Sequence, residues 1–330
     1  MLIRFTLALL LASASFASDK ISGAGASFPA SLYYNWAYNY RKDTRNIVNY
    51  QSIGSGGGIK QVTQRIVGFG ASDKPLTTQE LTKAKLLQFP AVIGSIVIAL
   101  NVAGIPDETL KLKNSVVAGI FAGEITLWND AAIVVDNKNL KLPNEKIVVI
   151  HRSDGSGTTY NFTYYLSESS QSWKQGYGIG KAINWAVGIG GKGNEGVSSL
   201  IKQTPNSIGY IENVFKTQNH LSAAILQTKS GKWVKATNEN FQAAAKYAVW
   251  TEKNNFFDVL VLEPGDTSYP LVAATFILLP VEKSEMNKKV IKFFDYAFKQ
   301  KEELANKLGY ILPTQDAKAA IREYWATNIK

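Results

Sequence analysis

Short apolar segments of strand length alternate along this chain with longer segments whose apolar residues recur at helical spacing. This alternation favours an α/β architecture, in which helices pack against a central sheet. The chain has 330 residues, more than a single hydrophobic core usually supports, so we expect two lobes. No Pro- or Ser-rich linker separates them, and we therefore expect strands to cross between them. The strand-like segments are residues 47–50, 96–101, 147–151, 208–211 and 275–279, and the helix-like segments are residues 30–42, 58–67, 159–167, 196–202, 238–248, 285–296 and 301–308.

The first residues have the pattern of a secretory signal peptide. Arg4 is followed by an apolar run at 5–12, and Ser15 and Ala17 place small residues three positions and one position before the expected cleavage site. The run is too short to span a bilayer, and no later stretch is long and apolar enough to do so. A buried N-terminal helix is the alternative. We expect cleavage after Ala17, removal of residues 1–17 and a location in the periplasm.

The absence of cysteine and the basic charge limit the partners. Without cysteine the chain has no disulfide, thiolate metal site, cysteine nucleophile or cysteine-linked lipid. A net charge of +10 attracts anions in general. The lysines are scattered, however, and the densest group, at 283–301, is interleaved with acidic and apolar residues as on a solvated helix face. We recognise no nucleic-acid-binding module and expect no nucleic acid.

Glycine-rich segments precede helix-like segments at residues 23–29 (GAGASFP), 54–58 (GSGGG) and 151–158 (HRSDGSGT). A helix N-terminus carries about half a positive charge and unpaired N–H donors, so it can bind an anion. Glycine also lets the backbone approach a ligand closely. Any one of these segments, taken singly, is compatible with an ordinary capped helix. Their convergence in space does not follow from spacing alone.

Polar side chains in the same segments suit a tetrahedral oxyanion. Arg152 presents a planar fork of charged donors. We expect Ser55 to cap the helix that follows it. The hydroxyl donors are Ser27, Ser55, Ser156 and Thr158.

One acidic residue, Asp73, lies in the segment FGASDKPL (69–76) at the expected end of a strand. The simpler interpretation is an Asp turn or a cap before a helix at Thr77. A second interpretation is more specific. Phosphate keeps a proton at neutral pH, and an ionised carboxylate can accept a hydrogen bond from it, whereas sulfate has no such proton and would be repelled. Asp73 would then select phosphate over sulfate.

Over essentially all of its mature length the chain resembles the PstS family of phosphate-binding proteins from ABC-type phosphate uptake systems. The resemblance implies a two-lobed periplasmic binding protein of type II-like α/β fold, each lobe a sheet flanked by helices, with two crossover strands as a hinge. It implies a first lobe of residues 18–92 plus 274–330 and a second lobe of residues 93–273. The motifs that carry it are GAGASFPA (23–30), NYQSIGSGGGIKQV (49–62), FGASDKPL (69–76), VAGIFAGEITLWND (117–130), RSDGSGTT (152–159), GIGGKGN (188–194) and TFILL (275–279).

The resemblance also implies the ligand site and the partners. Phosphate would be buried between the lobes, with Asp73 accepting its proton, Arg152 as the charged donor and Asp154 holding that arginine in place. Gly56 and His151 depart from residues common in the family, which affects affinity rather than ligand identity. We expect a monomer that hands phosphate to a membrane permease, with no cofactor, no metal and no enzymatic activity. The implied phosphate ligands are Ser27, Phe28, Ser55, Asp73, Arg152, Ser156, Gly157 and Thr158.

Three enzyme classes are alternatives to a binding protein. Residues 188–193 satisfy the dinucleotide pattern G-x-G-x-x-G, and Glu212 lies about 20 residues further on. That cofactor is not expected outside the cytoplasm, and the preceding strand is weak, so we expect a tight loop of the second lobe there. A serine-hydrolase elbow is absent and the chain holds only His151 and His220. An exported phosphate-ester hydrolase with a nucleophile near Arg152 is the alternative function.

Overall fold

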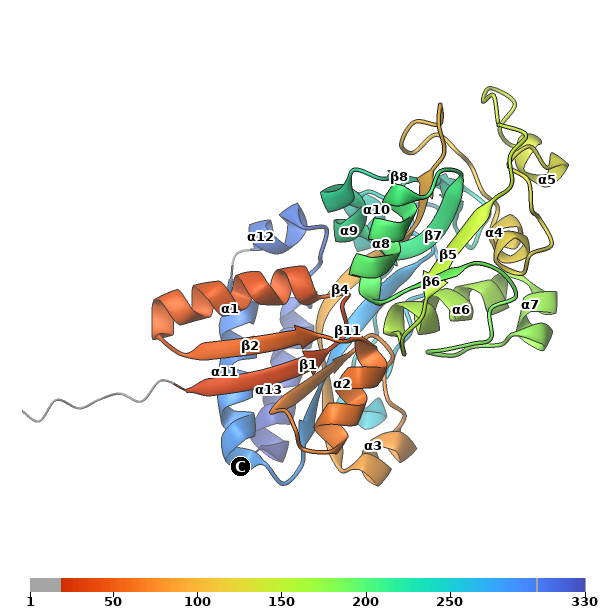
Figure 1. The fold of residues 1–330 in the computed structure, drawn as a ribbon. Coiled ribbons are helices and arrows are strands. Elements are labelled where there is room, and N and C mark those ends of the chain that lie inside the picture. The colour runs from red at the N-terminus through yellow and green to blue at the C-terminus, as the bar shows by residue number, and fades with distance from the viewer. Residues whose placement is uncertain (1–18, 301, 330) are drawn as a thin grey trace, which may run out of the picture.

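The computed structural model describes residues 19–300 and 302–329, which form two lobes of sheet and helix (Figure 1). The two-lobed α/β class predicted from the sequence is confirmed. The predicted signal peptide, residues 1–17, lies outside the described residues. Across the described ranges, none of the helices combines the length and the apolar character that crossing a membrane requires.

A mixed sheet runs through both lobes in the order β2-β1-β3-β11-β4-β7-β5-β6, with β8 added beside β4. Two short strands, β9 and β10, pair separately. The strands are β1 (Lys20–Gly25), β2 (Ile47–Ser52), β3 (Phe69–Ser72), β4 (Leu86–Asn101), β5 (Val148–Arg152), β6 (Ile189–Gly191), β7 (Ser207–Glu212), β8 (Ser222–Ala223), β9 (Leu226–Gln227), β10 (Trp233–Val234) and β11 (Val272–Pro280).

Helices from both ends of the chain, α1, α2, α11 and α13, lie in one lobe, while α4 to α8 lie in the other (Figure 1). The helices are α1 (Ala30–Thr44), α2 (Gly54–Thr63), α3 (Thr78–Ala84), α4 (Asn114–Phe121), α5 (Ala131–Val134), α6 (Gly157–Ser169), α7 (Gln171–Gly176), α8 (Gly193–Gln203), α9 (Asn213–Asn219), α10 (Asn238–Ala245), η1 (Glu252–Asn254), α11 (Ser284–Lys299), α12 (Glu302–Lys307) and α13 (Gln315–Asn328).

The long strand β4 belongs to both lobes. Its residues 86–95 pair antiparallel with β11, and its residues 96–101 pair antiparallel with β7. The strand is almost entirely apolar and buried, as expected where both faces of a sheet are covered. Gly94 allows a close approach at this strand, because a Cβ there would lie 2.7 Å from the ring of Phe28. The chain just before α1 therefore packs directly on the crossing strand.

Parallel pairing sets the position of the helix starts. In one lobe β1 is parallel to both β2 and β3, and in the other β5 is parallel to both β6 and β7. Ligands of α/β sheets bind beyond the carboxyl ends of such strands. Helices α1 and α2 begin shortly after β1 and β2, and α6, α8 and α9 begin shortly after β5, β6 and β7. The segments that follow these strand ends carry the predicted ligand residues.

Aromatic side chains hold the helices on the sheet. In the first lobe Phe294 of α11 packs edge-on against Tyr33 of α1 and Phe69 of β3, with ring centroids 5.7 and 5.5 Å apart. In the second lobe Phe162 of α6 stacks on Tyr210 of β7 at 4.2 Å. Such pairs add to the energy of burial and fix the orientation of each helix.

Most predicted elements are confirmed, one helix is shifted, and several observed elements, including α4, α7 and α9, are absent from the predicted set. The predicted set lacks β1, whose sequence KISGAG is too rich in small residues to resemble a strand, and it lacks α13. The helix expected at 58–67 instead begins at Gly54. It ends at Thr63 because Arg65 adopts a left-handed conformation with φ 61°.

Candidate functional site

The predicted ligand residues come together where the two lobes meet. A Cβ on Gly157 would lie 2.5 Å from Ser55 Oγ and 2.6 Å from Asp73 Cβ, so α6 of one lobe touches α2 and the end of β3 of the other. Arg152 Nη1 donates to Thr158 Oγ1 at 3.3 Å. All of these residues are buried: Ser27, Phe28, Ser55, Asp73, Arg152, Ser156, Gly157 and Thr158.

The lobes touch each other around this group. The Gly56 amide donates to the Gly155 carbonyl at 2.7 Å, which joins the start of α2 to the turn before α6. At the rim, Ser52 Oγ donates to Glu195 Oε1 at 2.8 Å. Gly54 has φ 78°, and a Cβ there would lie 2.2 Å from a carboxylate oxygen of Asp154. The site is therefore closed and shielded from water.

Arg152 is fixed by Asp154. Arg152 Nε and Nη2 donate to the two carboxylate oxygens of Asp154 at 2.7 and 2.6 Å, a bidentate pair. Burial disfavours the Asp154 charge, but the hydrogen bonds and charge of Arg152 outweigh it and hold the pKa of that carboxyl below its usual range. The Gly193 amide also donates to Asp154 at 3.1 Å. A guanidinium has five N–H groups, so after Asp154 and Thr158 it retains donors for an anion.

Asp73 is almost fully buried, with 2% of its surface exposed. Burial raises the pKa of Asp73 to about 7, although hydrogen bonds from Thr275 and Ser55 and the charge of Arg152 act in the opposite direction. Thr275 Oγ1 donates to Oδ1 at 2.7 Å, and Ser55 Oγ lies 3.4 Å from Oδ2. The carboxyl group is therefore poised to gain or lose a proton near neutral pH, inside a closed site.

Two capping predictions are wrong. Ser55 does not cap α2, whose N-cap residue is Ile53 without a side-chain bond; Ser55 Oγ instead accepts from the Asp73 amide at 3.1 Å. Asp73 does not cap α3 either, because Thr77 caps that helix in a capping box with Glu80. Both side chains are thereby directed to each other rather than to local helix ends.

Comparison with known proteins gives the family. A family model described as "PBP superfamily domain" matches residues 12–301. The phosphate-binding protein PstS of Haemophilus influenzae is 47% identical to this chain over 325 residues, which are 98% of this chain and 97% of that protein. The chain belongs to the PstS family of phosphate-binding proteins.

Solved structures share the fold of this PstS-family chain. One, described as a high affinity periplasmic phosphate-binding protein bound with phosphate, has a TM-score of 0.73 at 19% identity and covers 92% of this chain and 93% of its own. An ABC-type phosphate transport receptor from Vibrio cholerae has a TM-score of 0.55 at 19% identity and covers 89% of this chain and 100% of its own. At these identities the likeness concerns the fold.

Asn194 is a site residue that the sequence patterns did not single out. Its amide and its Nδ2 both donate to Ser27 Oγ at 3.0 Å, its Nδ2 lies 3.4 Å from Thr158 Oγ1, and its Oδ1 accepts from the Glu212 amide at 3.0 Å. The signal was present in the PstS-like motif that ends at this residue. We expected residues 188–193 to be only a tight loop, but their helix start places Asn194 between the lobes.

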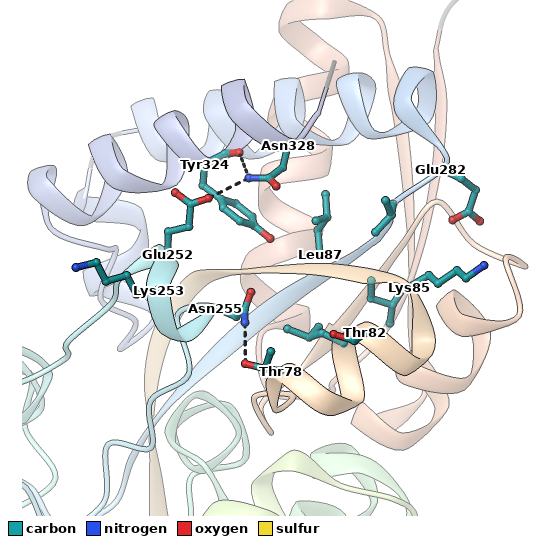
Figure 2. A pocket seen from close by; sticks show the side chains of 13 residues that line it. Thr78, Thr82, Lys85, Leu87, Glu252, Lys253, Asn255, Glu282, Tyr324 and Asn328 are labelled. Atoms are coloured by element: carbon teal, nitrogen blue, oxygen red, sulfur yellow. Dashed lines mark hydrogen bonds between the residues drawn. The ribbon is translucent and has the colours of Figure 1, made fainter.

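A separate pocket of about 510 Å³ lies between α3, η1 and α13 (Figure 2). Its lining carries both signs of charge, with Lys85 and Lys253 opposed by Glu252 and Glu282, and Asn328 bonds to Glu252 across it. None of the predicted ligand residues lines it. The predicted ligand residues of this PstS-family chain therefore lie in the site between the lobes and not in this pocket.

Proposed function

We propose that this protein binds inorganic phosphate between its lobes and delivers it to the membrane permease of an ABC transporter. The observation that carries the proposal is a closed site that combines a buried, oriented arginine with a buried carboxyl group of raised pKa and several hydroxyl and amide donors. Fixed donors suit a tetrahedral oxyanion, and a proton-accepting carboxylate suits one that still carries hydrogen. The names of the curated relatives agree with this function.

Both lobes would contribute residues that contact phosphate. Ser27, Ser55 and the amide of Phe28 would donate from the first lobe, and Asp73 would accept the phosphate proton. From the second lobe, Arg152 would donate with its remaining N–H groups. The other donors of that lobe would be Ser156, Gly157 and Thr158. Ser156 Oγ accepts a hydrogen bond from the Thr159 amide at 3.0 Å. Because this bond does not use the hydroxyl hydrogen of Ser156, that hydrogen is available to an anion.

We propose that the lobes comprise residues 18–92 plus 274–330 and residues 93–273. The exchange of partner strands within β4, from β11 to β7 after residue 95, supports a hinge near this division. Two strands passing between lobes permit a hinge motion, which would open the site for phosphate entry and release. We further propose a monomer in the periplasm, exported by a signal peptide that is cleaved after Ala17.

An exported phosphate-ester hydrolase on the same fold has less support. The curated relatives are named as binding proteins, and the contacts around the site leave little access for an ester substituent. A binding protein should take up one phosphate per chain and turn nothing over.

Isothermal titration calorimetry of phosphate-free protein with inorganic phosphate, alongside an assay with a chromogenic phosphate ester, tests this proposal. We expect one phosphate bound per chain and no ester hydrolysis. Hydrolysis that disappears in Ser156→Ala would support the hydrolase instead. Failure of the wild-type protein to bind phosphate would reject the binding function.

A further inference from the structure

A buried glutamate and a buried tyrosine meet next to Phe28, one of the proposed phosphate ligands. Glu212 ends β7 and Tyr310 follows α12, and neither side chain is exposed. Tyr310 Oη lies 2.6 Å from the carbonyl oxygen of Phe28 and 3.0 Å from Glu212 Oε2. Under the proposed division, Glu212 belongs to the second lobe and the other two residues belong to the first. The Tyr310 hydroxyl therefore bridges the lobes beside Phe28.

Glu212 also connects to Ser27, a second proposed ligand from the first lobe. Its backbone amide donates to Asn194 Oδ1 at 3.0 Å, and the amide and side chain of Asn194 both donate to Ser27 Oγ at 3.0 Å. Glu212 is thus linked by hydrogen bonds to Ser27 through Asn194 and to Phe28 through Tyr310.

Counting hydrogens indicates the protonation state of Glu212. A tyrosine hydroxyl has one hydrogen, and the shorter contact, to the Phe28 carbonyl, uses it. The contact between Tyr310 Oη and Glu212 Oε2 then requires a hydrogen on the carboxyl group. Oε2 can still accept from the Val214 amide, which lies 3.0 Å away.

Its surroundings also favour a neutral Glu212. Among the described residues Oε1 is buried without a hydrogen-bond partner, an environment that penalises a carboxylate far more than a neutral carbonyl. Burial and then the negative charge of Asp73 raise the pKa of Glu212 well above its usual range, although the Val214 and Asn213 amides oppose the shift. A bound phosphate would add further negative charge nearby.

We propose that Glu212 and Tyr310 are positioning residues for phosphate: neutral Glu212 donates to Tyr310, Tyr310 donates to Phe28, and the chain of bonds holds the lobes closed. This inference rests on the proposed phosphate function. The pair acts in the closed state, so its loss should speed phosphate release more than it slows phosphate capture.

Stopped-flow measurement of inorganic phosphate association and dissociation tests the pair. We expect Tyr310→Phe to raise the dissociation rate about tenfold, because it removes the hydrogen bond to Glu212 that joins the lobes, with association changed less than about twofold. Glu212→Gln keeps a neutral donor to Tyr310 and loses only the acceptor for the Val214 amide, a contact within the second lobe, so both rates should stay within about threefold of wild type, whereas Glu212→Ala should resemble Tyr310→Phe. Glu263→Gln, at a carboxyl away from the site whose pKa burial also raises, is the matched control.

A second readout does not depend on phosphate. An infrared difference spectrum between wild type and Glu212→Gln at pH 8 should contain the carbonyl band of a protonated carboxyl group. Absence of that band, or a dissociation rate in Glu212→Gln as fast as in Tyr310→Phe, would overturn the proposal. An unchanged dissociation rate in folded Tyr310→Phe would do the same. If wild type binds no phosphate, the proposed function fails, while the infrared band still reports on Glu212.

Discussion

Lowering the pH should admit sulfate to the site, because Asp73 then gains a proton. The pKa of Asp73 is raised to about 7, chiefly by burial. Sulfate has no proton to donate to a carboxylate at neutral pH, so it can bind well only when Asp73 itself carries one. For such a pKa, the protonated fraction is about one tenth at pH 8 and about nine tenths at pH 6. The apparent affinity for sulfate should therefore rise about tenfold between pH 8 and pH 6.

Asp73→Asn should remove this pH dependence and alter selectivity at the same time. The variant loses a charge-assisted hydrogen bond to phosphate, which contributes about 1.5–3 kcal/mol, so phosphate affinity should fall roughly 10- to 150-fold. Sulfate should bind to Asp73→Asn at pH 8 at least as well as it binds to wild type at pH 6. Thr275 can still donate to the amide oxygen at this position, so the fold around it should persist.

Calorimetric titration of phosphate-free protein with sulfate at pH 6, 7 and 8, repeated with phosphate, measures both effects. Glu263→Gln serves as the control, because its carboxyl pKa is also raised, to about 6, at a position outside the site. That variant should keep the wild-type preference for phosphate. Sulfate binding to wild type that is equally weak at pH 6 and pH 8, or continued exclusion by Asp73→Asn, would refute the carboxylate argument.

Three further predictions concern the same site. Arg152→Ala should weaken phosphate binding at least tenfold more than Ser55→Ala in calorimetry, because bonds from a charged donor are stronger than neutral ones, and equal losses would contradict this ranking. Gly157→Ala should lower phosphate affinity more than tenfold by keeping the lobes apart, since its Cβ would lie 2.8 Å from Asp73 Cα, whereas Gly176→Ala, with nothing within 4 Å, should bind normally. Asp73 binds its proton more tightly in the folded chain than in the unfolded chain, so protonated Asp73 stabilises the fold fully below pH 3.8, and this stabilisation is lost as the pH rises to about 7. The loss in the free energy of unfolding is about 4 kcal/mol at 1.36 kcal/mol per pKa unit. Denaturant unfolding of the phosphate-free protein should show this loss in wild type and not in Asp73→Asn.

Local chemistry explains which parts of the site the sequence could predict. The start of α6 was predictable because a serine cap and a glycine turn act within a few residues, and Ser156 does accept from the Thr159 amide. The pairing of Arg152 with Asp154 is also local, since the two residues are two positions apart. Alternating apolar segments likewise predicted the central strands, because burial on a sheet depends on the segment itself.

The remainder of the site depends on partners far away in the chain. Asn194 meets Ser27 across 167 positions, Thr275 meets Asp73 across 202, and Tyr310 meets Phe28 across 282. No periodicity within a segment encodes such pairs. The role of Ser55 was mistaken for the same reason: capping is a local rule, and the competing partner for its hydroxyl comes from the end of β3. Strand β1 was missed because its pairing with two parallel neighbours, rather than its own composition, makes it a strand.

The charges of the site suggest how attraction and selection are separated. Arg152 is paired with Asp154, and Asp73 adds a second acidic group, so the site itself has little or no excess positive charge. An unpaired buried cation would attract any anion, whereas in this site the charge of Arg152 is balanced, and binding depends on the orientation of its remaining N–H groups and of the hydroxyl and amide donors. Those donors are held in place by bonds such as the one that Ser156 Oγ accepts from the Thr159 amide, so little reorganisation is needed when a ligand arrives. Long-range attraction can then come from the basic surface of a chain with net charge +10, while the choice among tetrahedral anions depends on whether the ligand supplies the proton that Asp73 accepts.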